Sequence, residues 1–289
     1  MNGRRMVGMG LIAMGGGLAA SAVLGPLVLN VIKFHVSDTM ENQVVGGDVA
    51  SLVVAAPAAF AAGVLWMRGH RLAPALALAP SLYSIYYAVS LVVGEQYDRY
   101  PGNNEKFFPL YLGLAILGGV ISARVWSELG TEELPDPGAG LRRTTAGVLI
   151  ALGGLLGLAW ARSIWGVTTG TNLTQEYLGD PNVYWTIKLL DTAVIIPASL
   201  ATGIGLWMHK RTAVKAAYGI IGFLTCQGAA VAGMAVVMER RSDPAASMPF
   251  LVVISVGTVA LAVLTAGWLR LYLRGLRQAP RTNLAPATV

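Results

Sequence analysis

Eight long apolar stretches dominate the sequence and restrict what the chain can fold into. They are the segments Met6–Ile32, Val49–Met67, Leu72–Gly94, Phe107–Trp126, Thr144–Ile164, Tyr184–Met208, Ala213–Met238 and Met248–Leu273. A helix needs about 20 residues to cross the hydrocarbon core of a bilayer, and each segment is close to that length or longer. Because backbone groups in lipid must bond within their own segment, we predict an all-α transmembrane fold of eight helices.

The composition agrees with a membrane protein and excludes several kinds of site. Only 12% of the residues are charged and the mean hydropathy is +0.60, whereas a soluble domain is about 25% charged. The single cysteine, Cys226, leaves no disulfide framework and no metal site of several thiolates. The net charge of +6 is spread over short loops, so we expect no nucleic-acid partner. Neither a metal ion nor a cofactor is expected.

The distribution of Lys and Arg predicts the orientation of the spans. Of the 21 basic residues, 14 fall on one set of alternate loops and seven on the other. Because cytoplasmic loops are enriched in Lys and Arg, we expect the richer set and both termini to be cytoplasmic. Arg dominates the basic residues, and Ala, Gly, Val and Leu dominate the apolar ones. This bias is typical of a GC-rich bacterial genome, which makes the bacterial plasma membrane the expected location.

The second half of the chain repeats the order of motifs in the first half. A pair of arginines followed by LIAMGG at residues 11–16 reappears as a pair followed by LIALGG at residues 149–154. The further matched pairs are Asp48 and Asp191, Pro57 and Pro197, Gly63 and Gly203, Trp66 and Trp207, and Glu95 and Glu239. Four spans separate the members of each pair, so both copies enter the membrane from the same side. This predicts two parallel four-helix repeats, related by an axis along the membrane normal.

The duplication divides the chain into four predicted parts. They are a first four-helix repeat at 1–127, a cytoplasmic linker at 128–141, a second repeat at 142–275 and a cytoplasmic tail at 276–289. The first apolar segment could imitate a cleavable signal peptide. It continues to Ile32 and has an internal copy, so we expect it to be retained.

An acid that opens a span, a proline about two turns later and a following tyrosine-rich span form a recurring pattern. Its carriers are Asp48 with Pro57, the run Leu82–Tyr87 and the run Phe107–Tyr111. The pattern resembles uncharacterised bacterial eight-helix membrane proteins built from a duplicated four-helix unit. The resemblance covers most of the chain through loose motifs. It implies the architecture and, because that family has no assigned activity, it implies no functional residues.

Two carboxylates, Asp48 and Asp191, are the first candidates for a functional site. Each is expected near the outer end of the second span of its repeat, and intramembrane carboxylates are costly and often functional. The alternative is structural. A carboxylate in the first turns can cap its helix, and Lys188 stands three residues before Asp191, close enough to form an ion pair. Glu95 and Glu239 end the third span of each repeat and could line an acidic vestibule, or could be solvated rim charges.

A polar stripe runs along the third span. Tyr83, Tyr86, Tyr87 and Ser90 follow one another at short spacings, and Tyr83, Tyr87 and Ser90 share one face of the predicted helix. Gln227 takes the place of Tyr83 in the second repeat. These side chains could line a polar pocket, or could only hydrogen-bond between helices. Pro57 and Pro197 interrupt the helices at matched positions, and transporters place ion and substrate sites at such interruptions.

These residues support three hypotheses about function. The first is transport or binding of a small solute or cation from the outer face, and it predicts that Asp191→Asn abolishes uptake. The second is a structural or assembly subunit, with a membrane-protein partner or a second copy of the chain. The third, and least favoured, is a membrane enzyme that acts on a lipid-linked substrate with paired acids. No catalytic residue is assigned.

Overall fold

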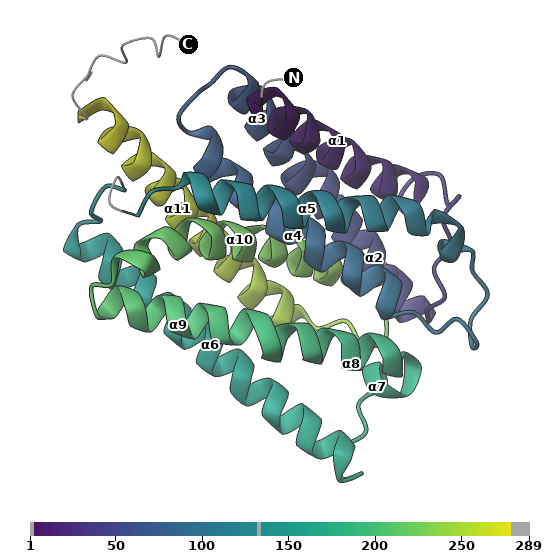
Figure 1. Ribbon diagram of the computed structural model, residues 1–289. Coiled ribbons are helices and arrows are strands. Elements are labelled where there is room, and N and C mark those ends of the chain that lie inside the picture. The colour runs from purple at the N-terminus through teal and green to yellow at the C-terminus, as the bar shows by residue number, and fades with distance from the viewer. Residues whose placement is uncertain (1–2, 132–133, 279–289) are drawn as a thin grey trace.

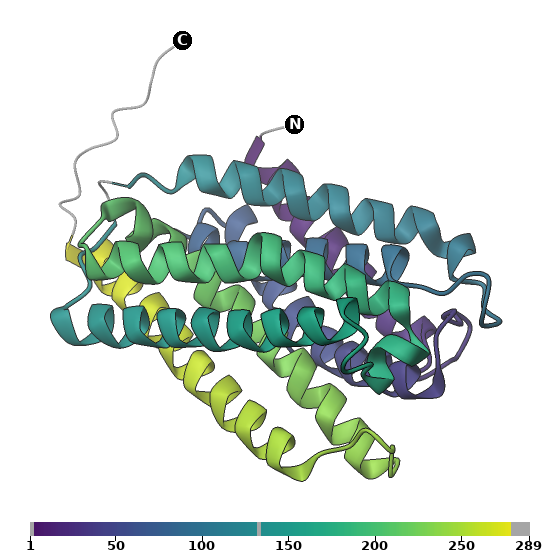
Figure 2. The same ribbon diagram turned by 90° about the horizontal axis from the view of Figure 1, so that it is seen from below.

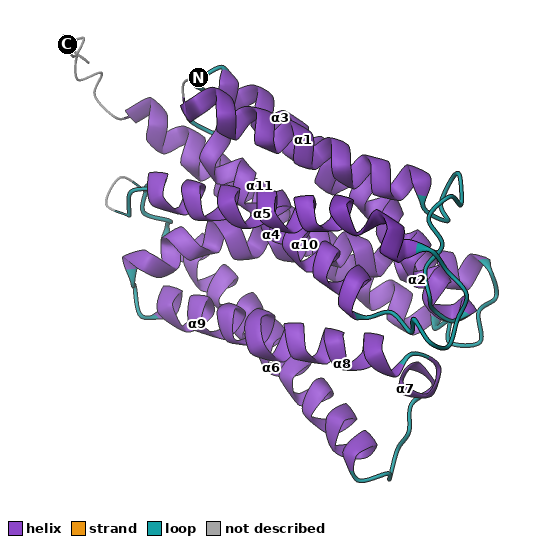
Figure 3. Cartoon of the chain, turned by 45° about the vertical axis from the view of Figure 1, so that its right-hand side comes forward, coloured by secondary structure: helices purple, strands orange, loops and turns teal. Residues whose placement is uncertain are grey.

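The computed structural model describes residues 3–131 and 134–278, and these residues fold into a bundle of helices (Figure 1). Loops gather at the two ends of the bundle, and no strand occurs in the described ranges (Figure 3). Eight helical spans within those ranges are long and apolar enough to cross a membrane. The chain is therefore a multi-pass, all-helical membrane protein by the length and composition of its helices.

Five spans are single helices, and three contain a change of helix type. The single helices are α1 (Gly3–Leu24), α4 (Ala73–Val93), α6 (Ala139–Thr168), α10 (Arg211–Arg240) and α11 (Met248–Gln278). The second span consists of α2 (Asp38–Ala50), the π-helical turn η1 (Ser51–Ala55) and α3 (Ala56–Met67). The fourth consists of η2 (Asn104–Phe107) and α5 (Phe108–Glu128). The sixth consists of α8 (Pro181–Leu190), the π-helical turn η3 (Asp191–Ile195) and α9 (Ile196–Trp207), and the short helix α7 (Gln175–Gly179) precedes it.

The predicted ends of two spans are wrong. The first apolar segment is helical only to Leu24, because Gly25 and then Pro26 follow and Pro has no N–H to continue the ladder. The second span begins at Asp38 rather than Val49, with Ser37 as its N-cap. Asp48 therefore does not open a span, because it is preceded by almost three helical turns.

The linker and the tail are also helical in part. The linker predicted at 128–141 is shortened at both ends by α5 and α6, and its residues 132–133 lie outside the described residues. The predicted tail begins inside α11, which continues to Gln278, and residues 279–289 lie outside the described residues.

The central helices are α4 and α10. The pair α1 and α3 lies on one side of them and the pair α6 and α9 on the other (Figures 1 and 3). α10 packs against α11 as an antiparallel pair (Figure 2). It also crosses α2 at Gly46 and Gly233, where a Cβ on either glycine would overlap the backbone of the other helix. This backbone contact fixes α2 against α10 without any intervening side chain.

Both π-helical turns lie just before a proline. η1 begins at Ser51 with Pro57 six residues later, and η3 begins at Asp191 with Pro197 six residues later. Proline cannot donate a backbone hydrogen bond, and its ring crowds the carbonyl four residues before it. A widened turn relieves this crowding, and π-helical turns often occur at functional positions in helices. The two turns present side chains of Ser51 and Asp191 to neighbouring helices.

Candidate functional site

The side chain of Asp48 is completely buried among α1, α2, α4 and α5. Its Oδ1 accepts a hydrogen bond of 2.6 Å from the Tyr87 hydroxyl, and its Oδ2 has no partner among the described residues. Gly25, just after α1, leaves room beside that oxygen, since a Cβ there would lie 2.8 Å from Oδ2. The capping alternative is wrong for Asp48, because Ser37 caps α2 and the carboxylate bonds to another helix.

Hydroxyl groups extend this site through the first half of the chain. Ser21 Oγ lies 2.9 Å from the Tyr87 hydroxyl and 3.3 Å from the Tyr111 hydroxyl. A second pair, Ser51 Oγ and the Tyr83 hydroxyl, is 2.8 Å apart. All five side chains are buried. Hydroxyls both donate and accept, so the connected hydroxyls of Tyr87, Ser21 and Tyr111 can rearrange their hydrogen bonds when the charge of Asp48 changes.

Asp191 has a different environment at the contact between η3, α4 and α6. Its Oδ1 accepts a hydrogen bond of 3.0 Å from the Tyr86 hydroxyl, and its Oδ2 accepts one of 2.8 Å from Trp160 Nε1. Only 8% of the residue is exposed. Both carboxylate oxygens thus have donors from other helices, so this residue does not cap its own helix.

Lys188 is directed to aromatic rings and to Glu176. Its Nζ lies 3.6 Å from the centre of the Trp160 ring and 4.4 Å from that of Tyr184, and 3.5 Å from Glu176 Oε1. The residue is 1% exposed. The ion pair expected with Asp191 is replaced by this cation–π box, which holds the ammonium group at the face of two electron-rich rings.

Consecutive tyrosines of α4 reach the two acids. Tyr87 donates to Asp48 and Tyr86 donates to Asp191. Successive residues of a helix point about 100° apart, so α4 can present one hydroxyl to each half of the molecule. The two acids are therefore both bonded to α4, although Asp48 and Asp191 face different groups of helices.

A cavity of about 70 Å³ lies next to these tyrosines. It is lined by Met40, Val44, Gly47, Tyr83, Tyr86, Tyr87, Ser90, Leu91, Val183, Ile187, Gln227, Ala230 and Met234. These residues come from α2, α4, α8 and α10, which belong to the second, third, sixth and seventh spans. The structure thus brings Tyr83, Tyr87, Ser90 and Gln227 together around one space, together with Tyr86.

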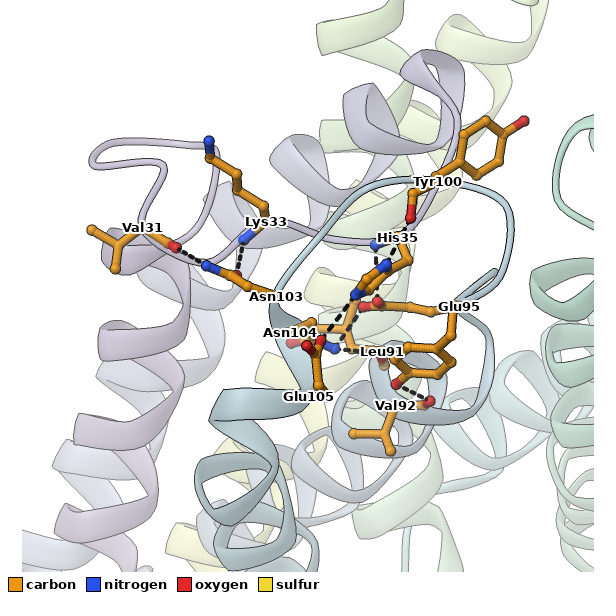
Figure 4. A network of polar contacts seen from close by, with 11 residues as sticks. Val31, Lys33, His35, Leu91, Val92, Glu95, Tyr100, Asn103, Asn104 and Glu105 are labelled. Atoms are coloured by element: carbon orange, nitrogen blue, oxygen red, sulfur yellow. Dashed lines mark hydrogen bonds and ion pairs between the residues drawn. The ribbon is translucent and has the colours of Figure 1, made fainter.

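Glu95 lies outside this cavity, in a loop cluster at one end of the bundle (Figure 4). Its Oε2 accepts a hydrogen bond of 2.9 Å from the His35 backbone N–H, and its Oε1 accepts one of 2.6 Å from Asn104 Nδ2. Only 2% of the residue is exposed, so the solvated-rim interpretation is wrong for Glu95. The carboxylate connects three loop segments instead of standing open in a vestibule.

The His35 ring faces an acceptor at each nitrogen. Nδ1 lies 2.7 Å from the Tyr100 carbonyl oxygen and Nε2 lies 2.9 Å from Glu105 Oε2. Burial lowers the pKa of His35, but these two hydrogen bonds and the nearby charges of Glu95 and Glu105 together raise it above 6.5. Burial raises the pKa of Glu95 to about 7, against the opposing effects of the His35 N–H and ring charge. Both His35 and Glu95 therefore hold their protons to a higher pH than they would in water.

The same end of the bundle joins loops that are distant in the sequence. Asp180 accepts hydrogen bonds from the backbone N–H and the hydroxyl of Ser37. Asp243 Oδ2 accepts one of 2.7 Å from Asn42 Nδ2. Glu239 is half-buried near the end of α10 and is not part of the Glu95 cluster. The acid that makes these loop contacts is thus Asp243, three residues after the end of α10.

Several contacts of the two acids were not predicted from the sequence. Tyr86 and Trp160 donate to Asp191, and Ser21 and Tyr111 extend the Asp48 site. Tyr86 belongs to the predicted tyrosine stripe, but its bond to Asp191 was not predicted. Trp160 lies eight residues before the end of α6, and Trp is common toward the ends of spans for its membrane-interface preference alone.

Comparison of the chain with protein-family models, with curated proteins and with solved structures finds no match.

Proposed function

We propose that the chain binds and transports a small solute or cation across the bacterial plasma membrane from the outer face, with Asp48 as the group that exchanges a proton or cation. The observation that carries the proposal is the buried Asp48 Oδ2, which has no partner among the described residues. Buried carboxylates inside membranes are costly and mark ion or proton pathways. An oxygen without a donor can be satisfied by a proton or by a bound cation.

The cavity between α2, α4, α8 and α10 supports a path to this group. Tyr87 lines the cavity and also donates to Asp48, so its hydroxyl connects the two. A space of about 70 Å³ has room for about two water-sized groups, which suits a small cation better than a large substrate. Gln227 and the tyrosine hydroxyls offer neutral oxygens to such a ligand.

The orientation and the duplication are part of the proposal. The start of α1 and the end of α11 lie at the same end of the bundle (Figure 1), and the excess of Lys and Arg favours a cytoplasmic location for that end. The matched π-helical turns, each six residues before a proline, support two parallel repeats. Matched glycine contacts add to this: a Cβ on Gly63 would meet Ile12, and one on Gly203 would meet Ile150.

Proton movement in liposomes tests the proposal. The purified full chain is reconstituted into vesicles that contain a pH-sensitive dye, and sodium, potassium or methylammonium chloride is added outside. Wild-type protein is expected to exchange protons for one of these cations. Asp48→Asn is expected to reduce the exchange to the level of empty vesicles, because an amide cannot gain or lose the proton.

The matched control is Asp38→Asn, which removes a carboxylate from the exposed first turn of the same helix. It should exchange protons as the wild type does. Wild-type exchange by Asp48→Asn would contradict the proposed role of Asp48. Lack of exchange by the wild type with all three cations would favour the alternative below.

The alternative function is a structural or assembly subunit. It is favoured by α11, which exposes a row of valines along one face: Val252, Val256, Val259 and Val263 are 55–66% exposed. Such a face suits either lipid or a helix of a partner. Isolation in mild detergent distinguishes these possibilities, because an assembly subunit should purify with a stoichiometric membrane-protein partner or as a homo-oligomer.

A further inference from the structure

A second and larger cavity lies at the opposite end of the bundle from the His35 cluster. It has a volume of about 260 Å³ and is formed where α6 begins and α9 ends, with Arg142, Arg143, Leu206, Trp207 and His209 as its lining. We propose that this cavity binds the phosphate-bearing headgroup of an anionic phospholipid.

The positive charge of the cavity is only weakly balanced by the described residues. The side chain of Arg142 is 12% exposed, and its Nη1 lies 4.0 Å from Asp136 Oδ1. The same oxygen lies 3.9 Å from Nη1 of Arg211, and the Asp136 side chain is 72% exposed. The Arg142 ion pair is thus long and partly solvated, and the same Nη1 donates a hydrogen bond of 3.4 Å to the Pro137 carbonyl oxygen. A guanidinium has five N–H donors and binds phosphate through two parallel hydrogen bonds, so Arg142 can add a phosphate to the two partners that its Nη1 contacts.

Arg143 and His209 add two cationic or hydrogen-bonding groups on the open side. Both residues are exposed, and both line the cavity. His209 adopts φ 59°, a left-handed conformation that follows the end of α9 and leads the chain into α10. The site therefore has donors from the start of α6 and from the turn that follows α9, so it lies between two membrane spans, where basic headgroup sites occur.

The apolar side of the cavity identifies a lipid rather than a soluble phosphate. Trp207 is 62% exposed and Met208 is 59% exposed, at the end of a membrane span. Exposed tryptophan at this depth is typical of the interface between headgroups and acyl chains. Ile204, one turn earlier and 47% exposed, extends the apolar surface along which an acyl chain can lie. Inorganic phosphate would use the arginines but not this surface.

Native mass spectrometry of the full chain in neutral detergent tests the proposal, with phosphatidylglycerol and phosphatidylcholine as probes. Wild-type protein should retain phosphatidylglycerol and prefer it to phosphatidylcholine. The double variant Arg143→Gln with His209→Asn should bind phosphatidylglycerol about tenfold more weakly, because it loses two charge-assisted contacts. Asn is chosen because it tolerates the left-handed backbone at this position.

The matched control is Arg4→Gln with Arg5→Gln, which removes two exposed charges from the start of α1 without touching the cavity. It should keep wild-type affinity, and thermal unfolding should show that both double variants are folded. Equal affinity of the cavity variant and the wild type would overturn the proposal, as would equal binding of the two lipids. Displacement of the lipid by inorganic phosphate at the same concentration would assign the site to a soluble phosphate instead.

Discussion

Asp48 and Asp191 are both buried, each in the second span of its half of the molecule, yet their carboxylates have different numbers of hydrogen-bond donors. Asp191 has a donor for each oxygen, from Tyr86 and Trp160. Asp48 has one donor, Tyr87, and an oxygen without a partner among the described residues. A fully bonded carboxylate holds helices together, whereas a half-bonded one retains capacity for a ligand. The proposed function therefore assigns the exchanging role to Asp48 rather than to Asp191, on the number of satisfied oxygens.

The largest expected difference between the two acids is in proton exchange. In the liposome assay, Asp191→Asn is expected to keep most of the exchange per folded molecule, while Asp48→Asn loses it. An asparagine at 191 can accept from Trp160 Nε1 through its oxygen and donate to the Tyr86 hydroxyl, so the helix contacts survive. Loss of exchange in Asp191→Asn with normal expression would break the comparison and restore the role that the sequence suggested for Asp191.

Closing the space beside Asp48 should weaken the site without removing its charge. In Gly25→Ala, the new Cβ would lie 2.8 Å from Asp48 Oδ2 and 2.9 Å from the Ser21 carbonyl oxygen. We expect cation-driven exchange to fall by about tenfold, since overpacking of this kind typically costs 1–3 kcal/mol. Gly16→Ala is the control, because its Cβ would meet nothing within 4 Å. An unchanged exchange rate in Gly25→Ala would show that Oδ2 needs no space for a ligand.

Truncation of the two acids should affect stability in the reverse order. Asp191→Ala leaves the Trp160 N–H and the Tyr86 hydroxyl unpaired, which we expect to lower the free energy of unfolding by about 1–3 kcal/mol. Asp48→Ala should cost less, because the Tyr87 hydroxyl can turn to Ser21 Oγ at 2.9 Å. Unfolding of the purified protein by a denaturing detergent measures both. Equal losses would mean that the two carboxylates have the same structural role.

A pH titration compares these acids with a third, Glu95, whose oxygens are bonded to loop groups. Its pKa is raised from 4.5 to about 7, so its folded state holds the proton more tightly than the unfolded state. Stability from this group is full below about pH 4.5 and falls as the pH rises to about 7. The pKa of His35 is raised above 6.5, so its contribution is lost as the pH rises further, through that raised pKa. The protection of the loop amides against hydrogen exchange, relative to their intrinsic rate at each pH, should fall over this range, and the fall should be smaller in His35→Gln.

The helical class and the number of spans could be predicted from the sequence, because long apolar segments in lipid have few alternatives. The start of the second span could not. Residues 38–48 contain polar side chains, yet they form the first turns of the same helix as the apolar run that follows, with Ser37 as its N-cap. Hydropathy depends on the side chains, whereas the helix is continued by backbone hydrogen bonds. The predicted start of this span, Val49, is therefore about ten residues too late.

The site was predictable only where spacing on one helix sufficed. Tyr83, Tyr87 and Ser90 repeat at four and three residues, and they do line one cavity with Gln227. The partners of Asp191 and Glu95 come from helices and loops that are distant in the sequence. Spacing along one helix gives no information about which neighbour faces it. The contacts of Tyr86, Trp160 and the His35 cluster therefore become visible only in the three-dimensional packing.

The crossing of α2 and α10 at Gly46 and Gly233 has a mechanical consequence. Two backbones in direct contact cannot approach further, and a side chain cannot be inserted between them. Sliding one helix along the other would drive the larger neighbour, Met234, into the Gly46 backbone. Rocking about the contact avoids this collision. If the chain transports as proposed, the glycine crossing would be the pivot about which the cavity opens to one side of the membrane and then to the other.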